Sequence, residues 1–595
     1  MPQPSGYRPW KYTHAYLRLS ISLGWVACLL GQGQSVALAQ PLPLPPELSP
    51  QEVTPPRQED FAPLPIAPEE ADIPSLRDLF PASPGTDPNA LPPEARGLAF
   101  TRFELKGSLA FNDDELTAAI RALVPLPSDR PASFPELVQV REATREYYEQ
   151  NHRLFGGFQV APPTPEGVLV LTVQEWDIAA VEVTGLQRLR PGYVSSRLAL
   201  ATGTPVDVER LQDALRLLNS DPLIESFAAN LGPGTSENTA VLRIDVTEAP
   251  TFSTDLTGNN GRSPSIGPFQ RGIQFREGNL LGLGDSASLS YNGTEGSNSL
   301  AVDYTVPVSP HNTTVSFSYS TSDSRIIQPP FDIFDIQSTA RYYDLTVRHP
   351  LIETPTAELA LGLTFSRWES ESRFLEGLLG RSVPLETLGS DDQGRTRLSV
   401  LRFAQEWTQY GQGQVLALRS QFNLGLDAFG ATIHDQAPDG RFLSWRGQGQ
   451  YIQLLAPDTL LLLRGTAQWG DRPLVPLGQF ALGGAGTVRG YRRDAVTADN
   501  GLFFSAEARF PILRVPELGG GLLQIAPFVD GGRVWSSGDL QPVLVTLAAI
   551  GLGLRWQSEG ISAQLDWGLP LTTTQVGTSN LQDSGLQFSL TISPF

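Results

Sequence analysis

The chain has 595 residues, of which 40% are hydrophobic and 18% charged, with 56 Gly, 50 Pro, five His and a single Cys. This length suggests roughly two to four domains. The formal net charge of −20 argues against nucleic-acid binding and against a basic membrane-surface role, and the lone Cys28 excludes a disulfide framework or a thiolate metal site.

Residues 1–39 have the pattern of a secretory signal peptide. A basic start precedes the apolar stretch Leu19 to Leu30, and Ala37-Leu38-Ala39 fits a small-residue cleavage site. A membrane anchor is the alternative, but ~12 apolar residues are too short to cross about 30 Å of hydrocarbon. Later segments lack an apolar run long enough for a spanning helix, so any membrane crossing would have to use a β-barrel.

Residues 40–97 are rich in proline, as in Pro41-Leu42-Pro43-Leu44-Pro45-Pro46. Proline fixes φ and removes a hydrogen-bond donor, so this composition does not favour a packed domain. We expect a largely disordered, semi-extended linker.

Residues 98–249 combine strand-like and helix-like patterns. Asn112 and Asp207 are candidate N-caps, each followed by a helical pattern. The expected strands are 99–105, 167–173, 180–183 and 240–246, and the expected helices are 113–124, 134–151, 191–199 and 207–218. The order repeats, so we expect two β-α-α-β-β domains, 98–176 and 177–249.

From residue 250 to residue 595 the chain alternates apolar and polar residues almost throughout, as in Val315-Ser316-Phe317-Ser318-Tyr319-Ser320. A soluble sandwich could show this alternation, but its length and low charge density favour a membrane barrel with an apolar outer face. Sixteen antiparallel strands would allow ~21 residues for each strand and its connection, enough for tilted spans of ~9–11 residues. The alternating end, Phe588 to Phe595, resembles the C-terminal signal of bacterial outer-membrane proteins.

A run in the second α/β domain carries a family resemblance. A helix ends in Leu218-Asn219-Ser220-Asp221-Pro222, and a strand then leads to Leu231-Gly232-Pro233-Gly234. The run resembles the second POTRA domain of two-partner secretion transporters, the haemolysin and filamentous-haemagglutinin secretion/activation family. The alternative is a plain helix stop and turn, which Asn, Pro and Gly make in any protein. The residues that carry the motif are Leu218, Asn219, Pro222, Pro233 and Gly234.

The resemblance extends into the barrel region and covers roughly residues 100–595. Gly278 to Asp285 resembles an early hairpin of the family, Tyr304 to Val308 a strand end, and Gln479 to Gly484 the start of the loop after strand eleven. One departure is Asn151 to Gly157, where the family commonly has Gly-Tyr. The family's N-terminal plug helix has no clear counterpart, because the proline-rich linker occupies its place.

The resemblance implies a contact between a loop and the inner barrel wall. In the family, the Arg of a Val-Arg-Gly-Tyr loop tip reaches the Asp of a Phe-x-Asp-x-Gly strand, and period-two counting puts the three named strand residues on one face. An Arg–carboxylate pair shielded from bulk water is stronger than a surface ion pair. The alternative is that the pair merely holds the loop in place. The residues implied are Val488, Arg489, Gly490 and Tyr491 in the loop and Phe528, Asp530 and Gly532 in the strand.

These observations predict a Gram-negative outer-membrane translocator with two periplasmic POTRA domains. By resemblance, it recognises an unfolded, β-rich secreted exoprotein of the haemagglutinin or haemolysin type, which carries an N-terminal secretion domain. Other expected partners are outer-membrane lipid and the barrel-assembly machinery, with no nucleic acid. We find no nucleophile–base set and no metal-ligand spacing, so neither an enzyme nor a cofactor is expected. A barrel-assembly insertase and a diffusion porin stay open as alternatives.

Overall fold

The computed structural model describes residues 97–153, 155–236, 239–516, 519–538, 544–572 and 580–594. The expected signal peptide, residues 1–39, lies outside the described residues, as does all of the expected linker except its last residue.

The first α/β domain contains a three-stranded sheet and two helices. Its elements are β1 (Arg102–Lys106), α4 (Asp113–Leu123), α5 (Phe134–Gln150), β2 (Phe155–Val160) and β3 (Val168–Glu175). The strand order is β1-β3-β2, with β1 parallel and β2 antiparallel to β3. Asn112 caps α4 by accepting hydrogen bonds from the backbone N–H groups of Asp114 and Glu115. The apolar face of each helix packs on the sheet, which buries Phe103, Ile120 and Leu171.

The second α/β domain repeats this arrangement. Its elements are β4 (Asp177–Thr184), α6 (Pro191–Ala199), α7 (Val208–Asn219), β5 (Ile224–Pro233) and β6 (Thr239–Glu248), in the strand order β4-β6-β5. Asp207 caps α7 through the backbone N–H of Arg210. Leu211, Leu215 and Leu218 recur on one face of α7 and are buried in the domain core. No helix among the described residues is long and apolar enough to cross a membrane.

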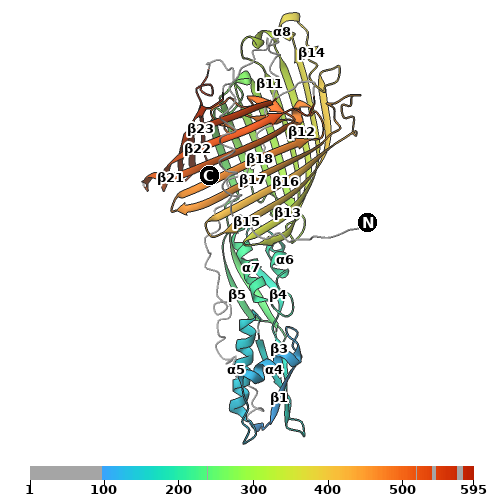
Figure 1. The fold of residues 1–595 in the computed structure, drawn as a ribbon. Helices are drawn as coiled ribbons and strands as arrows, with labels where there is room; N and C mark the ends of the chain where they lie inside the picture. The colour runs from blue at the N-terminus through green and yellow to red at the C-terminus, as the bar shows by residue number, and fades with distance from the viewer. Residues whose placement is uncertain are drawn as a thin grey trace, which may run out of the picture. The chain divides into compact units, whose positions relative to one another are not determined.

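The rest of the described chain forms a closed antiparallel barrel, whose strands run side by side in Figure 1. The strands are β7 (Phe252–Asn259), β8 (Gln270–Glu277), β9 (Ser286–Gly293), β10 (Ser297–Pro307), β11 (Thr314–Arg325), β12 (Gln337–Thr354), β13 (Ala357–Phe374), β15 (Arg395–Gly411), β16 (Gln414–Leu426), β17 (Leu443–Ala456), β18 (Thr459–Gly470), β21 (Asn500–Val515), β22 (Gly521–Trp535), β23 (Leu544–Ser558), β24 (Ile561–Pro570) and β25 (Leu586–Ile592). The expectation of sixteen strands is confirmed, because β13 pairs directly with β15.

Smaller elements lie in the connections between the barrel strands. They are η2 (Pro264–Ile266), η3 (Phe331–Phe334), α8 (Glu376–Leu379), β14 (Val383–Pro384), η4 (Pro476–Gly478), β19 (Phe480–Leu482) and β20 (Val496–Ala498). The two-residue β14 pairs with the end of β13, and β19 pairs with β20 in a separate two-stranded sheet.

The two faces of the barrel wall differ in polarity. Large apolar side chains such as Leu289, Phe317 and Leu345 are exposed on the outside, whereas Ser366, Arg402 and other polar side chains are buried on the inside. Period-two alternation therefore places an apolar face outward and a polar face inward, as a barrel in lipid requires.

Strand parity gives the two ends of the barrel. Because β7 begins directly after the second α/β domain, the turn between β8 and β9 lies at the barrel end nearer that domain, where the backbone N–H of Arg190 donates to the carbonyl of Gly282 at 2.9 Å. The eleventh strand of the circuit, β18, runs away from that end. The long connection from β18 to β21, residues 471–499, therefore starts and finishes at the far end.

Candidate functional site

Part of the 471–499 connection packs against the inner wall of the barrel. The strands β19 and β20 pair antiparallel, and the tip of the connection, residues 483–495, lies between them. Phe480, Leu482, Val488 and Tyr491 of this connection form one buried cluster with residues of β21, β22 and β23. Burial of these side chains fixes the tip on the wall, and we call residues 483–495 the inner loop.

Arg489 of the inner loop binds Asp530 on β22. Its Nε lies 2.8 Å from Oδ2 and its Nη2 lies 2.9 Å from Oδ1, a bidentate pair. The backbone N–H of Arg489 also donates to Oδ2 at 3.1 Å, and the hydroxyl of Ser505 donates to Oδ1 at 2.7 Å. Both charged residues are only 1% exposed. The guanidinium carbon lies 3.5 Å from the ring centroid of Phe528, a cation–π contact on the same strand face.

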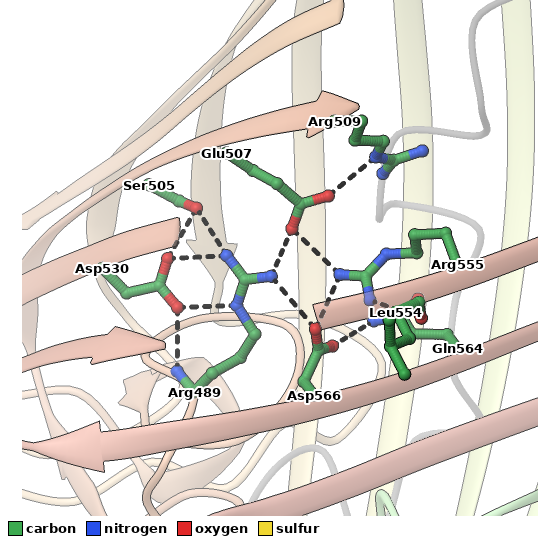
Figure 2. A network of polar contacts seen from close by, with 9 residues as sticks. All are labelled: Arg489, Ser505, Glu507, Arg509, Asp530, Leu554, Arg555, Gln564 and Asp566. Atoms are coloured by element: carbon green, nitrogen blue, oxygen red, sulfur yellow. Dashed lines mark hydrogen bonds and ion pairs between the residues drawn. The ribbon is translucent and has the colours of Figure 1, made fainter. Parts of the chain in front are cut away.

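The ion pair continues into a larger network, in which Arg489 lies between Asp530 on one side and Glu507 and Asp566 on the other (Figure 2). Glu507 accepts from Nη1 of Arg489 and, at 2.9 Å, from Nη2 of Arg555. Asp566 lies 2.7 Å from the same Nη2 of Arg555.

Formal charges balance within this network. Glu507 also accepts from Nε of Arg509 at 2.7 Å, which brings a third cation to the group. The network thus contains three cations and three carboxylates, namely Arg489, Arg509, Arg555, Glu507, Asp530 and Asp566. Since an unpaired buried charge is strongly unfavourable, each member depends on the others.

Close backbone contact brings the inner loop against β24. Gly490 has a φ of +92°, a conformation that favours glycine. A Cβ added to Gly568 on β24 would lie 2.6 Å from the backbone nitrogen of Gly490. On β22, a Cβ added to Gly532 would lie 2.5 Å from a methyl carbon of Leu482. A side chain at Gly568 would thus separate the inner loop from the wall, whereas one at Gly532 would meet the side chain of Leu482 and the carbonyl oxygen of Leu502.

Tyr491 extends the contact toward the neighbouring strands. Its hydroxyl lies 2.9 Å from the backbone carbonyl oxygens of Ala548 and Thr572 and 2.7 Å from the hydroxyl of Thr572. All seven predicted loop and strand residues therefore lie at one place on the inner wall.

The five motif residues of the second α/β domain lie apart from this wall. Leu218 is buried in the domain core, and Asn219 is the last residue of α7. Pro222 follows Asp221, whose carboxylate accepts from the hydroxyl of Tyr193 at 2.8 Å. Pro233 is the last residue of β5, and the backbone N–H of Gly234 donates to the carbonyl of Thr239 at 2.8 Å. The motif residues therefore make their contacts within their own domain.

Sequence reasoning missed several members of the network, namely Ser505, Glu507, Arg509, Arg555 and Asp566. A signal for them was present, because charged residues that alternate with apolar ones in a barrel strand point inward. Which of them meet depends on strand register, which the alternation does not specify. Within the described part of the chain, no group of His, Cys, Asp or Glu side chains is placed to hold a metal ion.

This chain is similar to known proteins in both sequence and structure. The sequence profile of the haemolysin secretion/activation protein family ShlB/FhaC/HecB matches residues 238–556. The outer membrane transporter CdiB of Escherichia coli is 23% identical over 451 residues, which cover 72% of each chain. The solved structure of CdiB from Escherichia coli superimposes with a TM-score of 0.62 at 19% identity and covers 86% of this chain and 93% of that one. CdiB from Acinetobacter baumannii gives 0.56 at 16% identity, over 83% and 90% of the two chains.

The structural likeness shows a shared fold, and the profile match spans more than half of the 595 residues. The chain therefore belongs to the haemolysin secretion/activation protein family ShlB/FhaC/HecB, the two-partner secretion transporters of the outer membrane, with its POTRA domains in the periplasm.

Proposed function

We propose that this transporter captures an unfolded, β-rich secreted protein in the periplasm through its POTRA domains and exports it through its barrel. The proposed domain bounds are 98–176 and 177–249 for the POTRA domains and 250–595 for the barrel. The observation that carries the proposal is the inner loop held on the barrel wall by a buried, charge-balanced network. A diffusion porin would explain the barrel but not the two α/β domains that precede it.

The POTRA sheets offer edges for capture of an extended chain. Within the described residues, β2 pairs only with β3 and β5 only with β6. An exposed edge strand presents unpaired backbone groups, which can bind an extended polypeptide with little demand on its sequence. This suits a transporter whose cargo is unfolded when it is captured. In the proposal, an N-terminal secretion domain of the cargo makes this first contact.

The inner loop provides the link between capture and passage. It lies against the inner wall, where exported chain would pass, so we assign it to the control of the pore. A role that is only structural is the alternative for Arg489, since removal of one partner leaves a buried charge unpaired. The two roles differ in what happens to the barrel when Arg489 is replaced.

The first experiment deletes this protein from its host and compares the proteins of the culture medium with those of the outer membrane. We expect one or a few large β-rich proteins to vanish from the medium while other barrels remain. Depletion of many outer-membrane barrels would instead identify a barrel-assembly insertase. An unchanged medium with loss of small-solute uptake would identify a porin.

The second experiment restores the deleted strain with variants. Arg489→Ala should abolish export while the barrel stays inserted and heat-modifiable on gels. Arg472→Ala is the matched control, because Arg472 lies in the same connection, is exposed and pairs with its neighbour Asp471. Normal export by Arg489→Ala would overturn the role given to the loop, and loss of the inserted barrel would support the structural role.

A further inference from the structure

The seam between the first and last barrel strands is the shortest ladder of the circuit. Strands β7 and β25 are joined by four residue pairs, from Asn259–Ser589 to Leu256–Ile592. The adjoining ladders have seven pairs between β24 and β25 and eight between β7 and β8. Because each ladder pair contributes backbone hydrogen bonds, the closure of the barrel has the least of this support at the seam.

A side chain continues the seam beyond its last backbone pair. The backbone N–H of Asn260 donates to the carbonyl of Phe588 at 3.2 Å. The side-chain oxygen of Asn260 accepts from the backbone N–H of Phe588 at 2.7 Å, and its amide nitrogen donates to the carbonyl of Leu586 at 2.9 Å. Asn260 thus takes the place of further β7 residues in the ladder, and it is 3% exposed.

The inner loop contacts the chain on both sides of this seam. On the β25 side, Nη2 of Arg492 lies 2.7 Å from Oδ2 of Asp583, whose side chain is 2% exposed. On the β7 side, Nη1 of Arg493 donates to the carbonyl of Gly261 at 3.1 Å. The side chain of Gln587 on β25 donates to the carbonyl of Tyr491 at 3.0 Å.

Gln582 contacts both the inner loop and the chain on the other side of the seam. Its side-chain oxygen accepts from the backbone N–H of Arg493 at 3.0 Å. Its amide nitrogen donates to the carbonyl of Arg262 at 2.6 Å and also to that of Asn260. Gln582 precedes β25 in the chain, Asn260 and Arg262 follow β7, and Arg493 belongs to the inner loop. One buried amide therefore ties the two strand ends and the loop together, and it is 1% exposed.

We propose that residues 491–493 are a latch across the barrel seam, with Arg492, Gln582 and Asp583 as its positioning residues. The docked loop adds a bidentate ion pair and several hydrogen bonds to the weakest closure of the barrel. Loop docking and seam closure share these contacts, so they form one coupled equilibrium, in which release of the loop loosens the seam. The inference concerns the barrel itself and stands whether or not the proposed export of cargo is right.

Hydrogen exchange of the purified full-length protein in lipid nanodiscs tests the latch without any cargo. Arg492→Ala should speed exchange in the seam peptides 252–262 and 586–594 by roughly 5- to 150-fold, the range expected for typical coupling energies. Exchange in β15 and β16 serves as the internal reference and should not change. Arg472→Ala, in the same connection but outside the latch, should leave the seam as it is in the wild type.

A charge exchange separates a latch from general damage. Arg492→Asp should loosen the seam, and the double variant Arg492→Asp with Asp583→Arg should restore slow exchange, because the same ion pair then runs in the opposite direction. Arg489→Ala, at the other anchor of the loop, should loosen the seam as well. Unchanged seam exchange in Arg492→Ala or in Arg489→Ala would overturn the proposal. If Arg492→Ala does not insert, Arg492→Lys, which keeps the charge, takes its place in the same measurement. Faster seam exchange in Arg492→Lys would support the latch, and unchanged seam exchange would overturn it.

Discussion

Replacing Gly568 with alanine should push the inner loop off the barrel wall without touching any charge of the network. The new Cβ would lie 2.6, 2.7 and 2.8 Å from Gly490 N, Gly490 Cα and Arg489 C, respectively. All three are backbone atoms, so no side-chain rotation relieves the clash. Overpacking of this kind costs typically ~1–3 kcal/mol. If the cost falls on the docked loop alone, the undocked population rises roughly 5- to 150-fold.

Thiol labelling measures that population. Val488, at 0% exposure, becomes the probe as Val488→Cys in a background where Cys28, the single cysteine of the chain, is replaced by serine. When the loop opens and closes rapidly relative to labelling, the labelling rate follows the open population. Gly568→Ala should raise this rate by the factor above.

Gly531→Ala is the matched control, because a Cβ there would have no atom within 4 Å although the residue adjoins Asp530. It should leave the labelling rate unchanged. Equal rates in Gly568→Ala and Gly531→Ala, with both barrels inserted and heat-modifiable, would refute the reasoning that backbone contact at Gly568 holds the loop.

Three further predictions concern the network and the first POTRA domain. Asp530→Asn keeps the side-chain shape but leaves the buried guanidinium of Arg489 without its main partner, which costs roughly 3–5 kcal/mol. The labelling rate of Val488→Cys should therefore rise further than it does in Gly568→Ala. A smaller rise would contradict this. The Arg130 side chain, with the Ser133 backbone N–H, lowers the pKa of Glu136 from 4.5 to about 2. A lowered folded-state pKa stabilises the fold above pH 4.5 and less as pH falls toward about 2. The protection factors of the α5 amides, which correct exchange for its intrinsic pH dependence, should therefore fall over that range in wild type but less in Glu136→Gln. Tyr148→Phe removes the hydroxyl that donates to the Glu175 carboxylate at 2.7 Å, which should cost about 1.5–3 kcal/mol and speed exchange in β3; unchanged exchange would show that the bond contributes little.

Most of the fold follows from residue periodicity. Alternation over residues 250–595 predicts the two-faced barrel wall, and the expected helix at 191–199 has the bounds of α6. The strand β2 (Phe155–Val160) escaped a specific prediction, because its sequence Phe-Gly-Gly-Phe-Gln-Val lacks alternation. The structure shows the reason, a register shift between Phe155 and Gly157 where β2 pairs with β3. An extra residue in one strand breaks the period-two pattern on which sequence reasoning depends.

The sequence predicts members of the candidate site only where they belong to a recognisable motif. Arg489 and Asp530 stand in recognisable runs, and the structure brings them into contact. Glu507 and Asp566 stand in ordinary alternating strands, β21 and β24, so the sequence indicates that they point inward and no more. Their meeting with Arg555 depends on the registers in which β22 pairs with β21 and β23, and β23 with β24. Register is a property of the whole sheet, so local residue patterns do not specify these contacts.

The balance of charge in the network bears on how a strongly held loop could be released, as the proposed control of the pore requires. With the loop docked, three arginines face three carboxylates. When Arg489 leaves, Arg509 and Arg555 stay on the wall with all three carboxylates, so the wall keeps one uncompensated negative charge and the loop takes away a positive one. In a dry protein core this separation would be prohibitive. In a barrel lumen that admits water, hydration replaces the lost ion pairs, and salt screens what attraction remains. Placing the anchor on an inner barrel wall therefore lets Arg–carboxylate chemistry be firm while the loop is docked and reversible once water enters.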